Sequence, residues 1–148
     1  MKPERRELST GIFFNRIPID KFKTSRISVS FVTPLSDEDK AAKVALLSSV
    51  LRQGTVTYKT PAAISRRQEE LYSAILSSIV TKIGDYQLLT FSVNFLDNAF
   101  VPNGEDLLRP ALDLLGEVVF KPLIDENSGV FLEEYVAVEK KNLINRIN

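Results

Sequence analysis

The sequence predicts an α+β fold, in which helices pack on one face of a mostly antiparallel sheet and the elements follow the order ββαα-ββ-αα. Residues 21–33 alternate between polar and large apolar side chains, which is typical of a half-buried strand. Residues 75–83 and 86–96 are β-prone and flank Gly84-Asp85, a short turn signal that favours an antiparallel hairpin. Phe91, Val93 and Phe95 share one parity, which implies one buried face. Pairs of segments with helical periodicity precede and follow this hairpin.

The chain is expected to open with two strands. Residues 11–19 are apolar and β-prone, and the alternating segment 21–33 follows them. Asp20 and Lys21 then mark the turn between these strands.

The first predicted helix begins at Ser36, a plausible N-cap followed by three acidic residues, and ends at Gly54. The second has Thr60 as its cap and Pro61 in the first helical position, which proline tolerates best. We expect this helix to continue to about Ala74.

After the hairpin, a third helix is predicted to open at Asn103 and to end at Phe120. A loop over residues 125–129 leads to a fourth helix that begins near Phe131. Its helical pattern reaches Asn148 without a cap or a breaker, so we expect residues 1–148 to form a single domain that ends within its last helix.

Composition limits the classes of function. The chain has 148 residues, of which 44% are hydrophobic and 26% charged, as in globular proteins. Its formal net charge is zero, which gives no reason to expect nucleic acid or a membrane as partner. The absence of cysteine suits a reducing compartment, and no apolar signal segment opens the chain, so a cytoplasmic location is expected.

The chemistry that is missing is equally informative. With no histidine and no cysteine, the chain alone holds neither a Ser-His-Asp triad nor a histidine- or thiolate-bound metal, and we expect no catalytic residue, metal or cofactor in it. Adjacent acids at 37–39, 69–70, 125–126 and 133–134 could be read as oxygen-ligand sites, but helix charges explain them more simply. Ser48-Ser49 could be read as nucleophiles, but no base accompanies them.

Residues 45–55, ALLSSVLRQGT, resemble the signature helix of the M16 (insulinase/pitrilysin-type, inverzincin) peptidases. In that family the helix reads His-x-x-Glu-His before Gly-Thr, so that two imidazoles bind zinc and the glutamate activates water. Ala45 stands at the first histidine position, Ser48 at the glutamate and Ser49 at the second histidine.

The resemblance covers nearly the whole chain. Residues 60–64 with 70–74 are similar to the family's second helix, and the segment 107–122 matches in order. Glu139-Lys140 looks like the start of the helix that carries the third zinc ligand, a glutamate seven residues on. That position is Arg146, so the resemblance implies that this ligand is lost as well.

The opening residues look most like bacterial zinc-less M16 homologues. The resemblance therefore implies the first domain, M16/LuxS-like in fold, of an inactive subunit that forms a peptide-binding chamber with a zinc-bearing M16 partner or with a copy of itself. Two alternatives stay open. The complete protein could be a zinc metallopeptidase whose active site lies outside residues 1–148, or this could be an unrelated α+β binding or structural domain.

Overall fold

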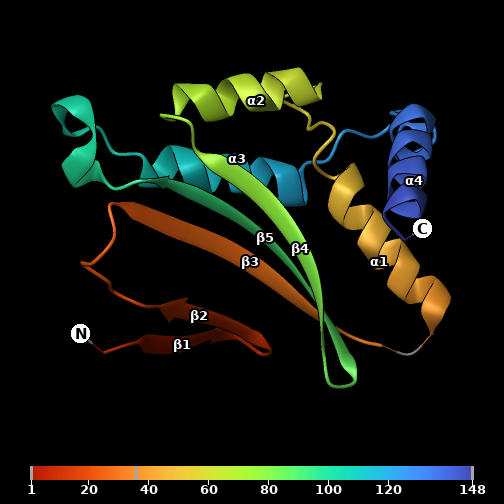
Figure 1. Ribbon diagram of the computed structural model, residues 1–148, viewed down its shortest axis with the longest axis horizontal. Coiled ribbons are helices and arrows are strands. Elements are labelled where there is room, and N and C mark those ends of the chain that lie inside the picture. Colours follow the sequence, from red (N-terminus) through yellow and green to blue (C-terminus); the bar gives the residue numbers. More distant parts are fainter. Residues whose placement is uncertain (1, 36, 148) are drawn as a thin grey trace.

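The computed structural model describes residues 2–35 and 37–147 and has the predicted α+β architecture. A three-stranded antiparallel sheet is formed by β3 (Thr24–Pro34), β4 (Ile75–Ile83) and β5 (Tyr86–Leu96), in the order β3-β5-β4. The α-helices of the protein are α1 (Glu38–Val50), α2 (Pro61–Glu70), α3 (Leu108–Phe120) and α4 (Glu133–Ile147). Figure 1 shows α1 and α3 lying along the same face of this sheet, while α4 packs against α1.

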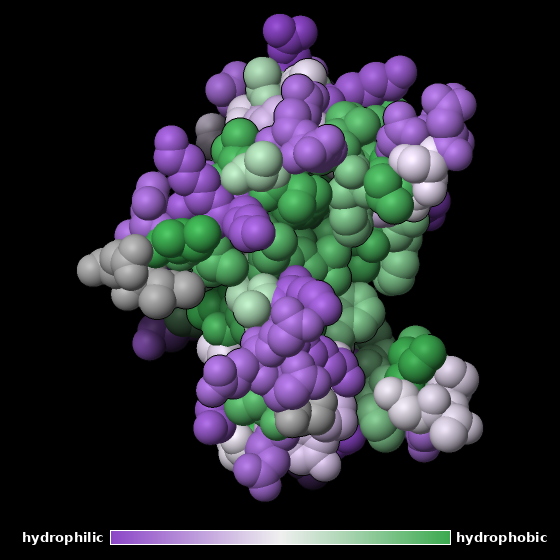
Figure 2. Space-filling model, turned by 90° about the vertical axis from the view of Figure 1, so that its right-hand side faces the viewer, coloured by the Kyte–Doolittle hydropathy of each residue, from purple (hydrophilic) through white to green (hydrophobic). Residues whose placement is uncertain are grey.

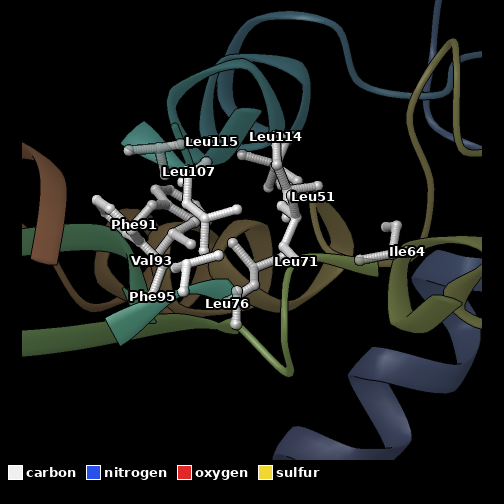
Figure 3. Close-up of a cluster of buried hydrophobic side chains, with 14 of the residues drawn as sticks. Leu51, Ile64, Leu71, Leu76, Phe91, Val93, Phe95, Leu107, Leu114 and Leu115 are labelled. Atoms are coloured by element: carbon white, nitrogen blue, oxygen red, sulfur yellow. The ribbon is translucent and has the colours of Figure 1, made fainter. Parts of the chain in front are cut away.

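The core lies between the sheet and the helices. The central strand β5 turns Phe91, Val93 and Phe95 inward, as their shared parity predicts, and all three are buried. They meet the inner face of α3, including Leu114 and Leu115 (Figure 3). The same cluster includes Leu51, just after α1, and Ile64 of α2, which lie close to the candidate site.

The opposite face of the sheet is rich in hydroxyl groups. The Ser30 and Thr90 hydroxyls lie 2.8 Å apart, and those of Ser77 and Ser92 lie 2.9 Å apart. Arg26 donates a hydrogen bond of 3.1 Å to Ser92 from β3. Hydroxyl pairs therefore link the strands on the side that the helices leave uncovered.

The prediction for the first two strands is wrong in its pairing. The apolar strand β2 (Ile12–Arg16) pairs with β1 (Glu4–Ser9), a strand that was not predicted, and β3 pairs with β5 instead. The charged run in β1 does not look like a strand, but Arg5 lies 4.3 Å above the Phe13 ring and Arg16 lies 3.7 Å from Glu4. These cross-strand contacts favour the hairpin that Figure 1 shows beside the sheet.

Three helix boundaries also differ from expectation. The predicted cap Ser36 lies outside the described residues, and Asp37 is the N-cap of α1, with its carboxylate accepting from the Lys40 amide at 2.6 Å. The helix α2 has the predicted Thr60 cap but ends before Tyr72 and Ser73, whose φ angles of 55° and 61° are left-handed. The helix α3 begins at Leu108 instead of Asn103, because residues 98–100 and 102–104 form short 3-10 turns.

Over the same described ranges, none of the helices has the length and apolar character needed to cross a bilayer.

Candidate functional site

The end of α1 is fixed by a junction of backbone hydrogen bonds, which we call the Gly54 junction and define as residues 54–59 with 121–123. Thr55 is fully buried, and its amide donates to the Tyr58 carbonyl at 2.8 Å. The Val56 amide donates to the Lys121 carbonyl at 3.0 Å, and the Leu123 amide donates to the Gly54 carbonyl at 3.1 Å. The junction therefore holds the C-terminal end of α1 beside the segment that leads from α3 to α4.

Ser48 is buried and Ala45, one turn before it in α1, is half-buried. The Ser48 hydroxyl donates to the Ala45 carbonyl at 2.7 Å, within the same helix, and Ser48 is only 8% exposed. Its own carbonyl accepts a 2.9 Å hydrogen bond from the Ser78 hydroxyl of β4. Ser48 is thus engaged in attaching α1 to the sheet, and it is not directed into open space.

Ser49 and Arg146 are brought together although they are far apart in the sequence. Arg146, near the end of α4, lies with its guanidinium Nη2 atom 3.5 Å from the Ser49 hydroxyl. Both residues line one cleft of about 450 Å³ that is open to solvent. Of the four positions that the resemblance singled out, the structure places two in this cleft, and Ala45 and Ser48 do not line it.

Four elements contribute to this cleft, which we call the α1–α4 cleft. Its lining comes from the end of α1, one side of α2, the start of β4 and one face of α4: Ser49, Arg52, Gln53, Pro61, Ile64, Ser65, Gln68, Leu76, Glu139, Asn142 and Arg146. Figure 2 looks onto the side of the molecule where α1 and α4 lie and shows hydrophilic residues gathered above and below hydrophobic ones.

One carboxylate, that of Glu139, belongs to the cleft lining. Glu139 is 8% exposed, and its Oε1 atom accepts hydrogen bonds from the side-chain amides of Gln53 at 2.7 Å and of Asn142 at 3.1 Å. The bond from Gln53 links α4 to the end of α1, the bond from Asn142 lies within α4, and together they occupy Oε1. A further bond, from the Tyr135 hydroxyl to the Lys59 carbonyl at 3.2 Å, ties the first turn of α4 to the Gly54 junction.

The donor set of the cleft does not fit a zinc ion. Zinc sites in proteins use imidazole, thiolate and carboxylate ligands, and this chain has no histidine and no cysteine. Serine hydroxyls are poor zinc ligands, and the guanidinium of Arg146 is a cation without a free lone pair. Within the part of the chain that the structure describes, no three acidic residues cluster as metal ligands either.

Sequence reasoning did not single out Arg52, Gln53, Glu139 and Asn142 as parts of a site. A signal for α4 was present, because Glu139, Asn142 and Arg146 are spaced at i, i+3 and i+7 and so share one helix face. No comparable signal shows from sequence that Gln53 meets Glu139, because 86 positions separate them.

Comparison with known proteins finds a peptidase-like relative of this chain. No protein-family model matches the chain. The chain is similar along nearly its whole length to a metalloprotease-like protein that is named as inactive, and it is a homologue of that protein.

The relative is "Probable inactive metalloprotease YmfF" of Bacillus subtilis (strain 168), which is 32% identical over 137 residues, 93% of this chain and 32% of that protein. A solved structure, described as the crystal structure of a conserved protein from Enterococcus faecalis V583, matches with a TM-score of 0.87 and 31% identity over 95% of this chain and 32% of that one. The chain thus spans about a third of the length of each.

Proposed function

We propose that this chain belongs to a non-catalytic, M16-type peptidase-like subunit, which helps to form a peptide-binding chamber with a zinc-bearing M16 partner. One observation carries the proposal: the α1–α4 cleft is present, but Ser49 and Arg146 stand in it where the resemblance expects zinc ligands. The similarity to a protein named as an inactive metalloprotease supports the same function. We place this subunit in the bacterial cytoplasm, as a member of a heterodimer.

The partner is tested by purifying the complete protein from its native cells under mild conditions and identifying co-purifying chains by mass spectrometry. A second chain that contains His-x-x-Glu-His, recovered in near-equal amount, is the expected result. Recovery of the protein alone, with a zinc site in its own remaining sequence, would contradict the inactive-subunit proposal and favour a self-contained metallopeptidase. Recovery of a homodimer without such a motif would contradict the heterodimer.

The lost ligands are tested by restoring them in steps. The triple variant Ala45→His, Ser48→Glu, Ser49→His is expected to show no peptidase activity, because the resemblance puts Arg146 at the third-ligand position and its guanidinium is a cation that lies 3.5 Å from the Ser49 hydroxyl. Adding Arg146→Glu should increase the zinc content measured by plasma mass spectrometry at least severalfold over the triple variant, because positions 49 and 146 both line the cleft and would then both carry zinc-binding side chains. Zinc-dependent cleavage by the triple variant alone would show that Arg146 does not occupy the third-ligand position.

A further inference from the structure

Two arginines from different elements line the α1–α4 cleft, and within residues 2–35 and 37–147 neither of them forms an ion pair with a carboxylate. Arg52 near the end of α1 donates from Nη1 to the Ser78 hydroxyl at 3.4 Å, and Arg146 in α4 donates to the Ser49 hydroxyl at 3.5 Å. Both bonds are long and both acceptors are neutral. A guanidinium has five N–H donors, so each arginine retains donors for a further group.

Charge in the cleft is not balanced by its own lining. The charged lining residues are two arginines and Glu139, which leaves one net positive charge. Glu139 forms no ion pair with either arginine among residues 2–35 and 37–147. Its Oε1 atom accepts hydrogen bonds from the side-chain amides of Gln53 and Asn142 instead. Other arginines of the protein do form ion pairs with carboxylates: Arg67, for example, lies 3.0 Å from Glu70.

The remaining lining suits a peptide. Amide groups of Gln53, Gln68 and Asn142 lie around the arginines, and Pro61, Ile64 and Leu76 supply apolar wall. A volume of about 450 Å³ falls within the usual range of ligand sites. A cleft whose lining includes two guanidinium groups and an apolar wall matches a carboxylate carried on an aliphatic stem.

We propose that the α1–α4 cleft binds a carboxylate group of a peptide, held between the guanidinium groups of Arg52 and Arg146. This inference rests on the proposed peptide-binding function, and it adds that peptides with a carboxylate group at this site bind more tightly than peptides without one. The carboxylate can come from an Asp or Glu side chain or from the C-terminus of the peptide, because the same guanidinium geometry accepts both.

Fluorescence anisotropy with the complete protein tests the proposal and separates these sources. The probes are dye-labelled peptides of one sequence: one with an internal Glu and an amidated C-terminus, one with Gln and a free C-terminus, and one with Gln and an amidated C-terminus. At least one carboxylate-bearing peptide is expected to bind about tenfold more tightly than the neutral one. The peptide that gains affinity identifies the source.

Arg146→Gln and Arg52→Gln are each expected to remove most of this tenfold preference. Lys141→Gln is the matched control, because it removes one positive charge from an exposed position of α4 outside the cleft lining. It should keep the preference, and thermal unfolding checks that all variants fold.

Equal binding of the three peptides would overturn the carboxylate site while leaving peptide binding in place. Equal losses in Lys141→Gln and Arg146→Gln would overturn it too, because they would indicate unspecific attraction. The protein could also be found to have no zinc-bearing partner and still prefer carboxylate peptides in a way that depends on both arginines. That result would support the carboxylate site and contradict only the proposed heterodimer.

Discussion

Leu114 and Leu112 belong to the same helix but have opposite surroundings. Leu114 is 1% exposed and packs in the core below α3, whereas Leu112 is 50% exposed. Two positions along a helix are about 200° apart, so identical side chains on α3 face the sheet and the solvent. At the scale of a residue, burial therefore decides what each leucine contributes to the free energy of unfolding.

Leu114→Ala is expected to lower the free energy of unfolding by about 2–5 kcal/mol, because the deletion leaves a cavity that its neighbours cannot fill. Leu112→Ala is the control and should change that free energy by no more than about 0.5 kcal/mol. Urea-induced unfolding followed by circular dichroism measures both. Similar losses in the two variants would mean that α3 presents a different face to the sheet.

At the scale of an element, the position of the end of α1 beside the segment after α3 depends on the Gly54 junction. A Cβ atom at Gly54 would lie 3.1 Å from the Lys59 carbonyl oxygen and 3.2 Å from the Leu123 Cδ2 atom. Gly116, within α3, has no atom within 4 Å of the corresponding position. The two glycines therefore respond differently to the same added methyl group.

Gly54→Ala is expected to destabilise the protein by about 1–3 kcal/mol, because backbone and side-chain atoms on both sides of the junction must move. Gly116→Ala should stabilise it by about 0.5–1 kcal/mol, because alanine loses less conformational freedom in a helix. Thermal unfolding of both variants gives the comparison. Stabilisation by Gly54→Ala would show that the junction has room that its contact distances do not indicate.

Local sequence patterns predicted which helices and strands form better than they predicted where these elements end or how the strands pair. The parity of Phe91, Val93 and Phe95 correctly predicted the inner face of β5, and Thr60-Pro61 correctly predicted the start of α2. The pairing of β2 with β1 was not predicted, because β1 is charged on the surface and its stability comes from cross-strand contacts. In the candidate site, Ser49 and Arg146 were reached only through a family resemblance, since nothing local reveals a contact across 97 positions.

At the scale of the whole molecule, the sheet and the hairpin β1–β2 differ in how much of them is buried. Every residue of β1 and β2 is exposed, while β5 is largely buried. Large apolar side chains in and just after this hairpin are exposed as well: Leu8, Ile12, Phe13, Phe14, Ile17, Ile19 and Phe22. A two-stranded hairpin without a packed face is marginally stable in water.

Hydrogen–deuterium exchange followed by mass spectrometry should therefore show fast exchange across residues 4–16 and strong protection of β5 in this chain. The β4 strand, at the edge of the sheet, is the internal reference and should be intermediate. Protection of the hairpin equal to that of β5 would contradict its exposure and would mean that its apolar side chains are covered.

The Gly54 junction has a consequence for how such a protein can change over evolutionary time. Main-chain hydrogen bonds join the segment after α1 to the segment after α3, since the Leu123 amide donates to the Gly54 carbonyl and the Val56 amide donates to the Lys121 carbonyl. The position of the C-terminal end of α1 is thus held by backbone bonds that do not involve the side chains at positions 45, 48 and 49, so these side chains can be exchanged while the end of the helix keeps its place. One scaffold can in this way lose an old chemistry through point mutation and acquire another while its folding remains intact.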